Sequence, residues 1–133
     1  PVQVTVVREQ FLESVNASDA AIIASGTASL QTGLALKPFV IVYRVSKLTF
    51  IIARMLAETK YIGIVNVIAG KEIVPELLQN EFTVSNITDH AVRILQDHEY
   101  RGTMIGELKK IGKKLGEPGA YVKAANCIED LIN

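Results

Sequence analysis

The sequence is poor in cysteine and carries no excess charge of either sign. Its 133 residues include 14 Lys and Arg against 14 Asp and Glu, so the overall charge does not point to a nucleic-acid partner. The single cysteine, Cys127, excludes a disulfide within the chain and is typical of a reducing compartment. The most apolar window, residues 48–57, contains Thr49 and Arg54 and is far shorter than the roughly 20 residues of a membrane span.

Signals of export and of metal binding are also lacking. Arg8, Glu9 and Glu13 interrupt any apolar stretch near the amino terminus, so we expect no secretory signal peptide. The chain begins with Pro1 rather than Met, and we therefore expect it to be a fragment of a longer protein. Both histidines stand in a polar helical stretch where we expect surface positions, so the sequence predicts no metal site and no other cofactor.

The first part of the chain alternates β-rich runs with amphipathic helical patterns. We expect strands at residues 2–7, 20–24, 39–43 and 61–65, and helices at residues 8–16, 27–36 and 48–56. Such alternation predicts βαβ units around a parallel sheet, an α/β Rossmann-like fold. In such sheets, ligands bind at the carboxyl ends of the strands.

After Pro75 we expect only helices. One is predicted at residues 75–79, one around residues 87–95 with Ser85 or Asn86 as its cap, and one around residues 105–115 closed by Gly116. A last helix, residues 121–131, should bury Cys127. We therefore expect a single domain over residues 1–133. Its α/β core spans residues 1–80, and a helical tail, residues 81–133, packs on the sheet or on a partner chain.

The strongest local signal is a buried strand that runs into a turn of small residues and then a helix, residues 20–31. A helix start offers unpaired N–H groups and a positive dipole end, which suits a phosphate. Gly26 permits close approach of the backbone, and the hydroxyls of Ser25 and Thr27 can donate hydrogen bonds to an anion. The same residues also suit an ordinary capped helix, and the pattern alone leaves both interpretations open.

A second candidate segment spans residues 66–79 and begins where we expect a strand to end. Asn66 can donate to and accept from a uracil or a ribose. On the predicted helix, Glu76 and Gln79 share one face, where a carboxylate can accept hydrogen bonds from two ribose hydroxyls. The alternative is an ordinary solvated helix that begins at Pro75.

A third candidate segment spans residues 43–50. Arg44 follows a predicted strand and can bind either a pyrophosphate or a neighbouring carboxylate. Lys47, Phe50 and Arg54 stand among apolar residues, a pattern typical of a helix on a membrane surface. The same pattern suits a core helix with a solvated edge.

Three blocks in this order, ASGTASL (24–30), KPFVIVYRVSKLTF (37–50) and NVIAGKEIVPELLQ (66–79), resemble the lipid-A-disaccharide synthase family. The resemblance implies a GT-B glycosyltransferase, in which two Rossmann-like domains face each other across a cleft. This chain resembles the carboxyl-terminal half, which holds the sugar nucleotide. The amino-terminal half, with the acceptor pocket and the general base, is absent from it, so we expect the isolated chain to be inactive.

The implied reaction transfers 2,3-diacylglucosamine from UDP to the 6-hydroxyl of 2,3-diacylglucosamine 1-phosphate, with inversion at the anomeric carbon. By this resemblance the pyrophosphate would lie on the Ser25–Gly26–Thr27 turn, near Arg44. The nucleotide would lie against Asn66, Glu76, Gln79 and Gln31. Family members commonly carry Glu where this chain has Gln31, which can still bond a ribose but without charge.

The resemblance further implies a cytoplasmic enzyme on the inner face of the inner membrane, held there by peripheral contact. A homodimer through the helical tail also fits. Two alternatives remain at this point. The chain can belong to another GT-B enzyme that acts on a UDP-sugar, or it can be a non-catalytic dimerisation module built on residues 86–133.

Overall fold

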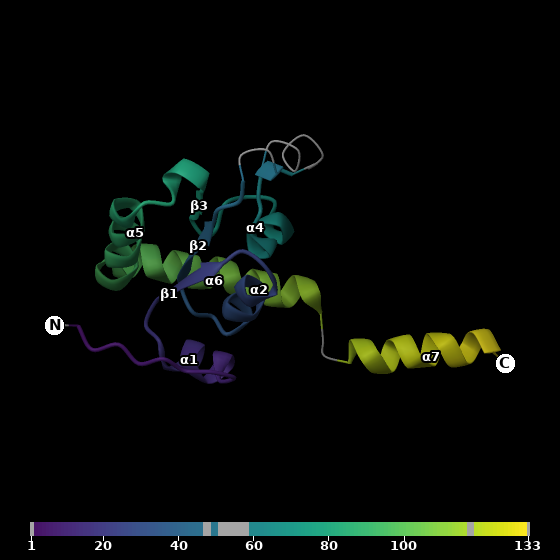
Figure 1. The fold of residues 1–133 in the computed structure, drawn as a ribbon. Coiled ribbons are helices and arrows are strands. Elements are labelled where there is room, and N and C mark those ends of the chain that lie inside the picture. The colour runs from purple at the N-terminus through teal and green to yellow at the C-terminus, as the bar shows by residue number, and fades with distance from the viewer. Residues whose placement is uncertain (1, 47–48, 51–58, 117–118, 133) are drawn as a thin grey trace.

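The computed structural model describes residues 2–46, 49–50, 59–116 and 119–132, and Figure 1 shows their arrangement. The elements follow in the order α1 (Phe11–Ala17), β1 (Ala21–Ala24), α2 (Thr27–Leu34), β2 (Phe39–Tyr43), α4 (Ile64–Ala69), β3 (Glu76–Leu78), the 3-10 turn η1 (Gln79–Glu81), α5 (Val84–Gln96), α6 (His98–Leu115) and α7 (Ala120–Ile132).

The three strands form one parallel sheet in the order β1-β2-β3. The central strand is the most apolar: Phe39, Val40 and Ile41 are all completely buried. Because successive side chains of a strand point to opposite faces, Val40 and Ile41 show that both faces of β2 are covered. Helices α2 and α5 pack against β1 and β2, and α6 contacts α2, α4 and α5. The expected α/β Rossmann-like fold is confirmed.

Helix α2 lies close to its neighbours because Gly33 has no side chain. A Cβ at Gly33 would lie 2.8 Å from Val65 Cγ1 on α4 and 3.2 Å from Leu108 Cδ2 on α6. Val65 and Leu108 are completely buried, so this junction is part of the core. It fixes the position of α2, whose amino terminus carries the candidate phosphate turn.

Two expectations for the first strands are wrong. Residues 2–7 form no strand, and Val2, Val4 and Val6 are at least 78% exposed. The alternation of valines alone is insufficient, because a strand needs a partner and a buried face. Within residues 20–24, Ala21–Ala24 do form β1, but it is an edge strand of the described sheet: Ile23 is buried, while Ile22 is 52% exposed.

The third strand is not the expected one. Residues 61–65 were expected as a strand, but Gly63 precedes α4, and Gly70 ends that helix in the left-handed conformation. Residues 75–79 were expected as a helix, but Glu76–Leu78 form β3, and the Pro75 carbonyl accepts a hydrogen bond from the Ile41 amide at 2.9 Å. A proline just before a strand costs no ladder hydrogen bond, so its presence did not require a helix.

Most of the expected helical tail packs on the α/β core. Helix α5 begins at a Thr83 cap rather than at Ser85 or Asn86, because the Thr83 hydroxyl accepts from the Asn86 amide at 3.2 Å. Helix α6 ends at Gly116, as expected, and buries Met104, Leu108 and Ile111. One side of each helix is therefore part of the core.

Helix α7 differs from the other tail helices. It extends away from the rest of the chain (Figure 1), and Tyr121 and Leu131 are 93% and 86% exposed. Cys127 was expected to be buried but is exposed. The helical pattern was therefore correct, while the packing expected for it was not.

The expected helix at residues 48–56 lies largely outside the described residues, as do Lys47 and Arg54. In the part of the chain that the structure describes, no helix has the length and apolar character needed to cross a bilayer.

Candidate functional site

Three of the residues singled out by the sequence follow directly after the three strands. Ser25 follows β1, Arg44 follows β2 and Gln79 follows β3. The strands are parallel and in register, so their carboxyl ends meet at one edge of the sheet. This carboxyl edge is where ligands of open α/β sheets bind.

The turn between β1 and α2 is open to an incoming group. Gly26 precedes α2 with φ at +146°, a conformation that L side chains rarely adopt, and a Cβ there would meet nothing within 4 Å. Within the part of the chain that the structure describes, no side chain caps α2, and the Ser29 hydroxyl donates back to the Gly26 carbonyl at 2.7 Å. The first N–H groups of α2, beside the exposed Thr27, therefore remain available to an anion.

Ser25 and Gln31 flank this open turn. The Ser25 amide donates to Val42 O at 3.2 Å and so continues the sheet pairing past β1. Its hydroxyl donates to Ile62 O at 3.4 Å, a long hydrogen bond that a better acceptor can replace. Gln31 is exposed on α2. Both side chains can therefore turn towards a ligand without breaking a strong contact.

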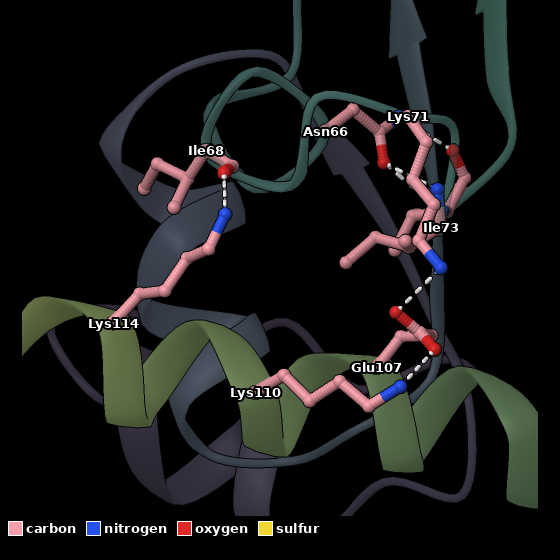
Figure 2. Close-up of polar contacts among 8 residues, drawn as sticks. Asn66, Ile68, Lys71, Ile73, Glu107, Lys110 and Lys114 are labelled. Carbon is pink, nitrogen blue, oxygen red and sulfur yellow. Dashed lines mark hydrogen bonds and ion pairs between the residues drawn. The ribbon is translucent and has the colours of Figure 1, made fainter.

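Asn66 lies on α4 rather than at a strand end, and it is completely buried. Its Nδ2 donates to Val74 O and to Glu76 Oε1, both at 2.7 Å. Its Oδ1 accepts from the amides of Ile73 at 2.8 Å and Val74 at 3.0 Å, and Figure 2 shows the bond to Ile73. The amide therefore already makes the four hydrogen bonds of which it is capable, all within the protein.

Glu76 also makes internal hydrogen bonds. Its two carboxylate oxygens accept from the amides of Ile62 and Gly63, each at 2.9 Å, in addition to the bond from Asn66. These amides lie just before α4, so the carboxylate ties the chain that enters this helix to β3. Glu76 and Gln79 do not share a helix face, because Glu76 lies in β3 and Gln79 follows it.

Gln79 is held in a strained position at the end of β3. Its φ is +51°, in the left-handed region, and its Oε1 accepts from the Val45 amide at 3.2 Å. Its Nε2 is buried and has no hydrogen-bond partner in the described part of the protein. A buried donor without a partner costs about 1–3 kcal/mol, so it marks a position where an acceptor would be stabilising.

Arg44 is hydrogen-bonded to the turn that follows β3. Its Nη2 donates to the carbonyls of Gln79 and Phe82, both at 3.1 Å, and its guanidinium lies over the Phe82 ring at 5.3 Å. Arg44 is nevertheless exposed, and a guanidinium has five donors in total. It can therefore hold η1 in place and still offer N–H groups at the carboxyl edge.

A cluster that the sequence analysis missed joins the loop after α4 to α6. Glu107 pairs with Lys71 at 2.8 Å and with Lys110 at 2.6 Å, and Lys114 donates to Ile68 O at 3.0 Å (Figure 2). Hydrogen bonds from Lys110 and Lys71 lower the pKa of the Glu107 carboxyl. Only the spacing of Glu107 and Lys110 could have indicated part of this cluster from the sequence.

A cavity of about 380 Å³, lined by Lys71, His90, Arg93, Tyr100 and Met104 among others, lies beside the loop that leads into β3, away from the Gly26 turn. Among the residues that the structure describes, no group of His, Cys, Asp and Glu is placed to hold a metal ion.

Comparison with known proteins gives the family of the chain. The family profile described as "Lipid-A-disaccharide synthetase" matches residues 1–126. The chain belongs to the lipid-A-disaccharide synthase family. The resemblance inferred from the three sequence blocks is thereby confirmed.

Curated lipid-A-disaccharide synthases are similar to this chain over most of its length. That of Anaeromyxobacter dehalogenans is 42% identical over 113 residues, which cover 85% of this chain and 30% of the relative. That of Myxococcus xanthus is 40% identical over 120 residues, 90% of this chain and 31% of the relative. That of Syntrophus aciditrophicus is 39% identical over 125 residues, 94% of this chain and 33% of the relative. The chain thus spans about a third of the length of these synthases.

Proposed function

We propose that this chain is the donor-binding half of an inverting glycosyltransferase that makes the lipid A disaccharide. The donor is UDP-2,3-diacylglucosamine and the acceptor is 2,3-diacylglucosamine 1-phosphate. Family membership supports the reaction. The open turn at Gly26 is the observation that supports donor binding by this chain. That turn presents an uncapped helix start at the carboxyl edge, where the pyrophosphate of UDP would lie.

In this proposal the turn stabilises the leaving group. As the bond between the anomeric carbon and the β-phosphate oxygen breaks, negative charge grows on the diphosphate. The N–H groups at the start of α2 face that charge, and the hydroxyls of Ser25 and Thr27 donate to it. The exposed guanidinium of Arg44 adds a positive charge nearby. No metal is needed for this stabilisation, because fixed dipoles and a cation supply it.

The nucleoside would lie further along the same edge. The buried Nε2 of Gln79 offers a donor that has no acceptor among the described residues, and the exposed Gln31 can bond a ribose hydroxyl. Asn66 and Glu76 belong to the same proposed site, but their polar atoms are engaged in the protein. We assign them to the support of the site rather than to contact with the nucleotide.

Calorimetric titration of the 133-residue chain with UDP, UMP and uridine tests this role. A site built around the pyrophosphate should bind UDP at least about tenfold more tightly than UMP, since each charge-assisted hydrogen bond is worth about 1.5–3 kcal/mol. Equal affinity for the three compounds would contradict the proposed place of the pyrophosphate. We also propose that the general base and the acceptor pocket lie outside this chain, so we expect no disaccharide formation by the chain alone.

The exposed side of α7 favours a second role beside donor binding. Tyr121, Val122, Ile128 and Leu131 are all more than half exposed, and such a helix is typical of one that packs on another part of an assembly. We propose that the tail holds two copies together as a homodimer. Light scattering of the chain and of a Tyr121→Ser, Leu131→Ser variant tests this: the dimer should dissociate in the variant.

Contact with the cytoplasmic face of the inner membrane stays a proposal based on the acylated substrates. Its predicted residues are Lys47, Phe50 and Arg54. Each cation near an anionic surface is worth about 1 kcal/mol. Charge reversal at Lys47 and Arg54 in the intact enzyme should release it from anionic vesicles, and unchanged sedimentation would contradict this assignment.

A further inference from the structure

The carboxylate of Glu76 lies at the centre of a network behind the open turn. It accepts three hydrogen bonds, from the amides of Ile62 and Gly63 and from the side chain of Asn66, at 2.7–2.9 Å. A carboxylate is an acceptor only, so it matches three donors without conflict. A side chain that carried a donor of its own would leave at least one of these N–H groups unpaired.

The peptide groups of Ile62 connect this network to the turn. The Ile62 amide donates to Glu76 Oε2 at 2.9 Å, and the Ile62 carbonyl accepts from the Ser25 hydroxyl at 3.4 Å. A strong hydrogen bond thus fixes the segment whose carbonyl faces Ser25. The network therefore places the Ile62 carbonyl, which the Ser25 hydroxyl contacts through a long hydrogen bond.

The approach of Glu76 depends on the absence of a side chain at Gly63. A Cβ at Gly63 would collide with Ile41 Cδ1 and would lie 3.0 Å from Glu76 Oε1. The segment before α4 therefore lies directly against the sheet at β2. In this position both amides are within reach of the carboxylate, at 2.9 Å each.

Asn66 fixes the other end of the network. It binds the backbone of Ile73 and Val74, and the adjoining Pro75 carbonyl accepts from the Ile41 amide at 2.9 Å. The start of β3, and with it Glu76, is therefore tied both to α4 and to the central strand. All the bonds of Asn66 lie within the protein, which indicates support rather than ligand contact.

We propose that Glu76, held by Asn66, is a positioning residue that sets the Ile62–Gly63 segment against Ser25 and so presets the phosphate-binding turn. This inference rests on the proposed binding of UDP at that turn. It assigns Glu76 an action through the backbone of Ile62, without contact with the nucleotide. Preset donors bind an anion more tightly, because they lose little freedom when it arrives.

The test compares Glu76→Gln with Glu72→Gln in the 133-residue chain. Both substitutions remove one negative charge, and Glu72 is exposed in the same connection between α4 and β3. We expect Glu76→Gln to weaken UDP binding by at least about tenfold, since small displacements of positioned groups cost factors of this size. Glu72→Gln should bind UDP as the unmodified chain does. A folded Glu76→Gln variant with unchanged affinity would overturn the proposal.

Amide chemical shifts in the absence of UDP separate this inference from the proposed function. Glu76→Gln should move the amide signals of Ser25 and Gly26, and Glu72→Gln should not. If the unmodified chain fails to bind UDP, the proposed function is wrong, while these shifts still decide whether Glu76 positions the turn. Unmoved Ser25 and Gly26 signals in a folded variant would overturn the positioning role.

A double-mutant cycle distinguishes positioning from a general structural role. If Glu76 acts through Ser25, Glu76→Gln should weaken UDP binding much less in a Ser25→Ala background than in the unmodified chain. Equal effects in both backgrounds would contradict the link.

The unmodified chain supplies a measurement that requires no folded variant. UDP should change the hydrogen exchange of the Ile62 and Gly63 amides, because a Ser25 hydroxyl that turns to the phosphate releases the Ile62 carbonyl. Unchanged exchange at saturating UDP would contradict the proposal.

Discussion

Asn66 donates a hydrogen bond of 2.7 Å to Glu76, and the other bonds of both side chains go to the protein backbone. Asn66 on α4 binds the chain that leads into β3, and Glu76 on β3 binds the chain that leads into α4. The two segments therefore hold each other in place next to the central strand. The polar atoms that we expected to contact a nucleotide are thus bonded within the protein.

Substitution of Gly63 should disturb this arrangement directly. We expect Gly63→Ala to lower the free energy of unfolding by about 1–3 kcal/mol, because its Cβ would displace Ile41 and press on Glu76. Thermal or urea unfolding measures the change. Gly102→Ala on α6 is the matched control: nothing lies within 4 Å of its Cβ, so the helix should gain about 0.5–1 kcal/mol. Equal stability of the two variants would show that the segment before α4 can move away at little cost.

Substitution of Gly26 should weaken UDP binding, even though there is space for a side chain at this position. Its φ of +146° strains any L side chain, at a cost of order 1–3 kcal/mol, although a Cβ there would meet nothing. Gly26→Ala should therefore rotate the backbone of the turn and weaken UDP binding by at least about tenfold. Calorimetry below the unfolding temperature measures this. A Gly26→Ala chain that binds UDP normally would show that the turn does not hold the pyrophosphate.

Substitution of Gln79 should change UDP affinity more than it changes the free energy of unfolding. In Gln79→Met the buried, unpartnered Nε2 disappears together with the bond from Val45, so the two effects oppose each other. We expect the free energy of unfolding to change by less than about 1 kcal/mol. UDP affinity should fall, because the donor that we propose for the nucleotide is gone. A loss of stability with unchanged affinity would instead mean that Gln79 serves only to hold the end of β2.

The sequence was sufficient for the parts of the fold that local pattern determines. Phe39 to Tyr43 form β2 because five consecutive apolar residues suit a strand buried on both faces. The Gly26 turn is recognisable because small residues separate a strand from a helix. We predicted a strand at residues 61–65 and a helix at residues 75–79, and the structure has the reverse. Short apolar runs suit either structure, and pairing with a neighbouring strand decides between them. Here β2 pairs with Glu76–Leu78.

The roles of the candidate residues were harder to predict than their positions. Ser25, Arg44 and Gln79 follow strands and do lie at the carboxyl edge. Asn66 and Glu76 bond each other across ten positions of sequence, and no spacing rule indicates such a pair. Likewise, the bonds from Arg44 to the carbonyls of Gln79 and Phe82 arise only because β2 and β3 are neighbours.

Stability should depend on pH through Glu107. Hydrogen bonds from Lys110 and Lys71 lower the pKa of this carboxyl in the folded chain, so the folded state favours the ionised form. The resulting stabilisation is present above the pKa of the unfolded chain and is lost as the pH falls through the lowered pKa of the folded chain. Unfolding measured between neutral and acidic pH should show a smaller loss of stability in Glu107→Gln than in the unmodified chain. Parallel curves for the two proteins would contradict this assignment.

We propose that UDP binds at the carboxyl edge of the sheet, on the turn after β1. Titration of the isotope-labelled 133-residue chain with UDP, followed by amide chemical shifts, tests it residue by residue. We expect the largest shifts at Ser25, Gly26 and Thr27, followed by Gln79, with α5 to α7 unaffected. Absence of shifts at saturating UDP, or shifts confined to residues 84–132, would contradict it.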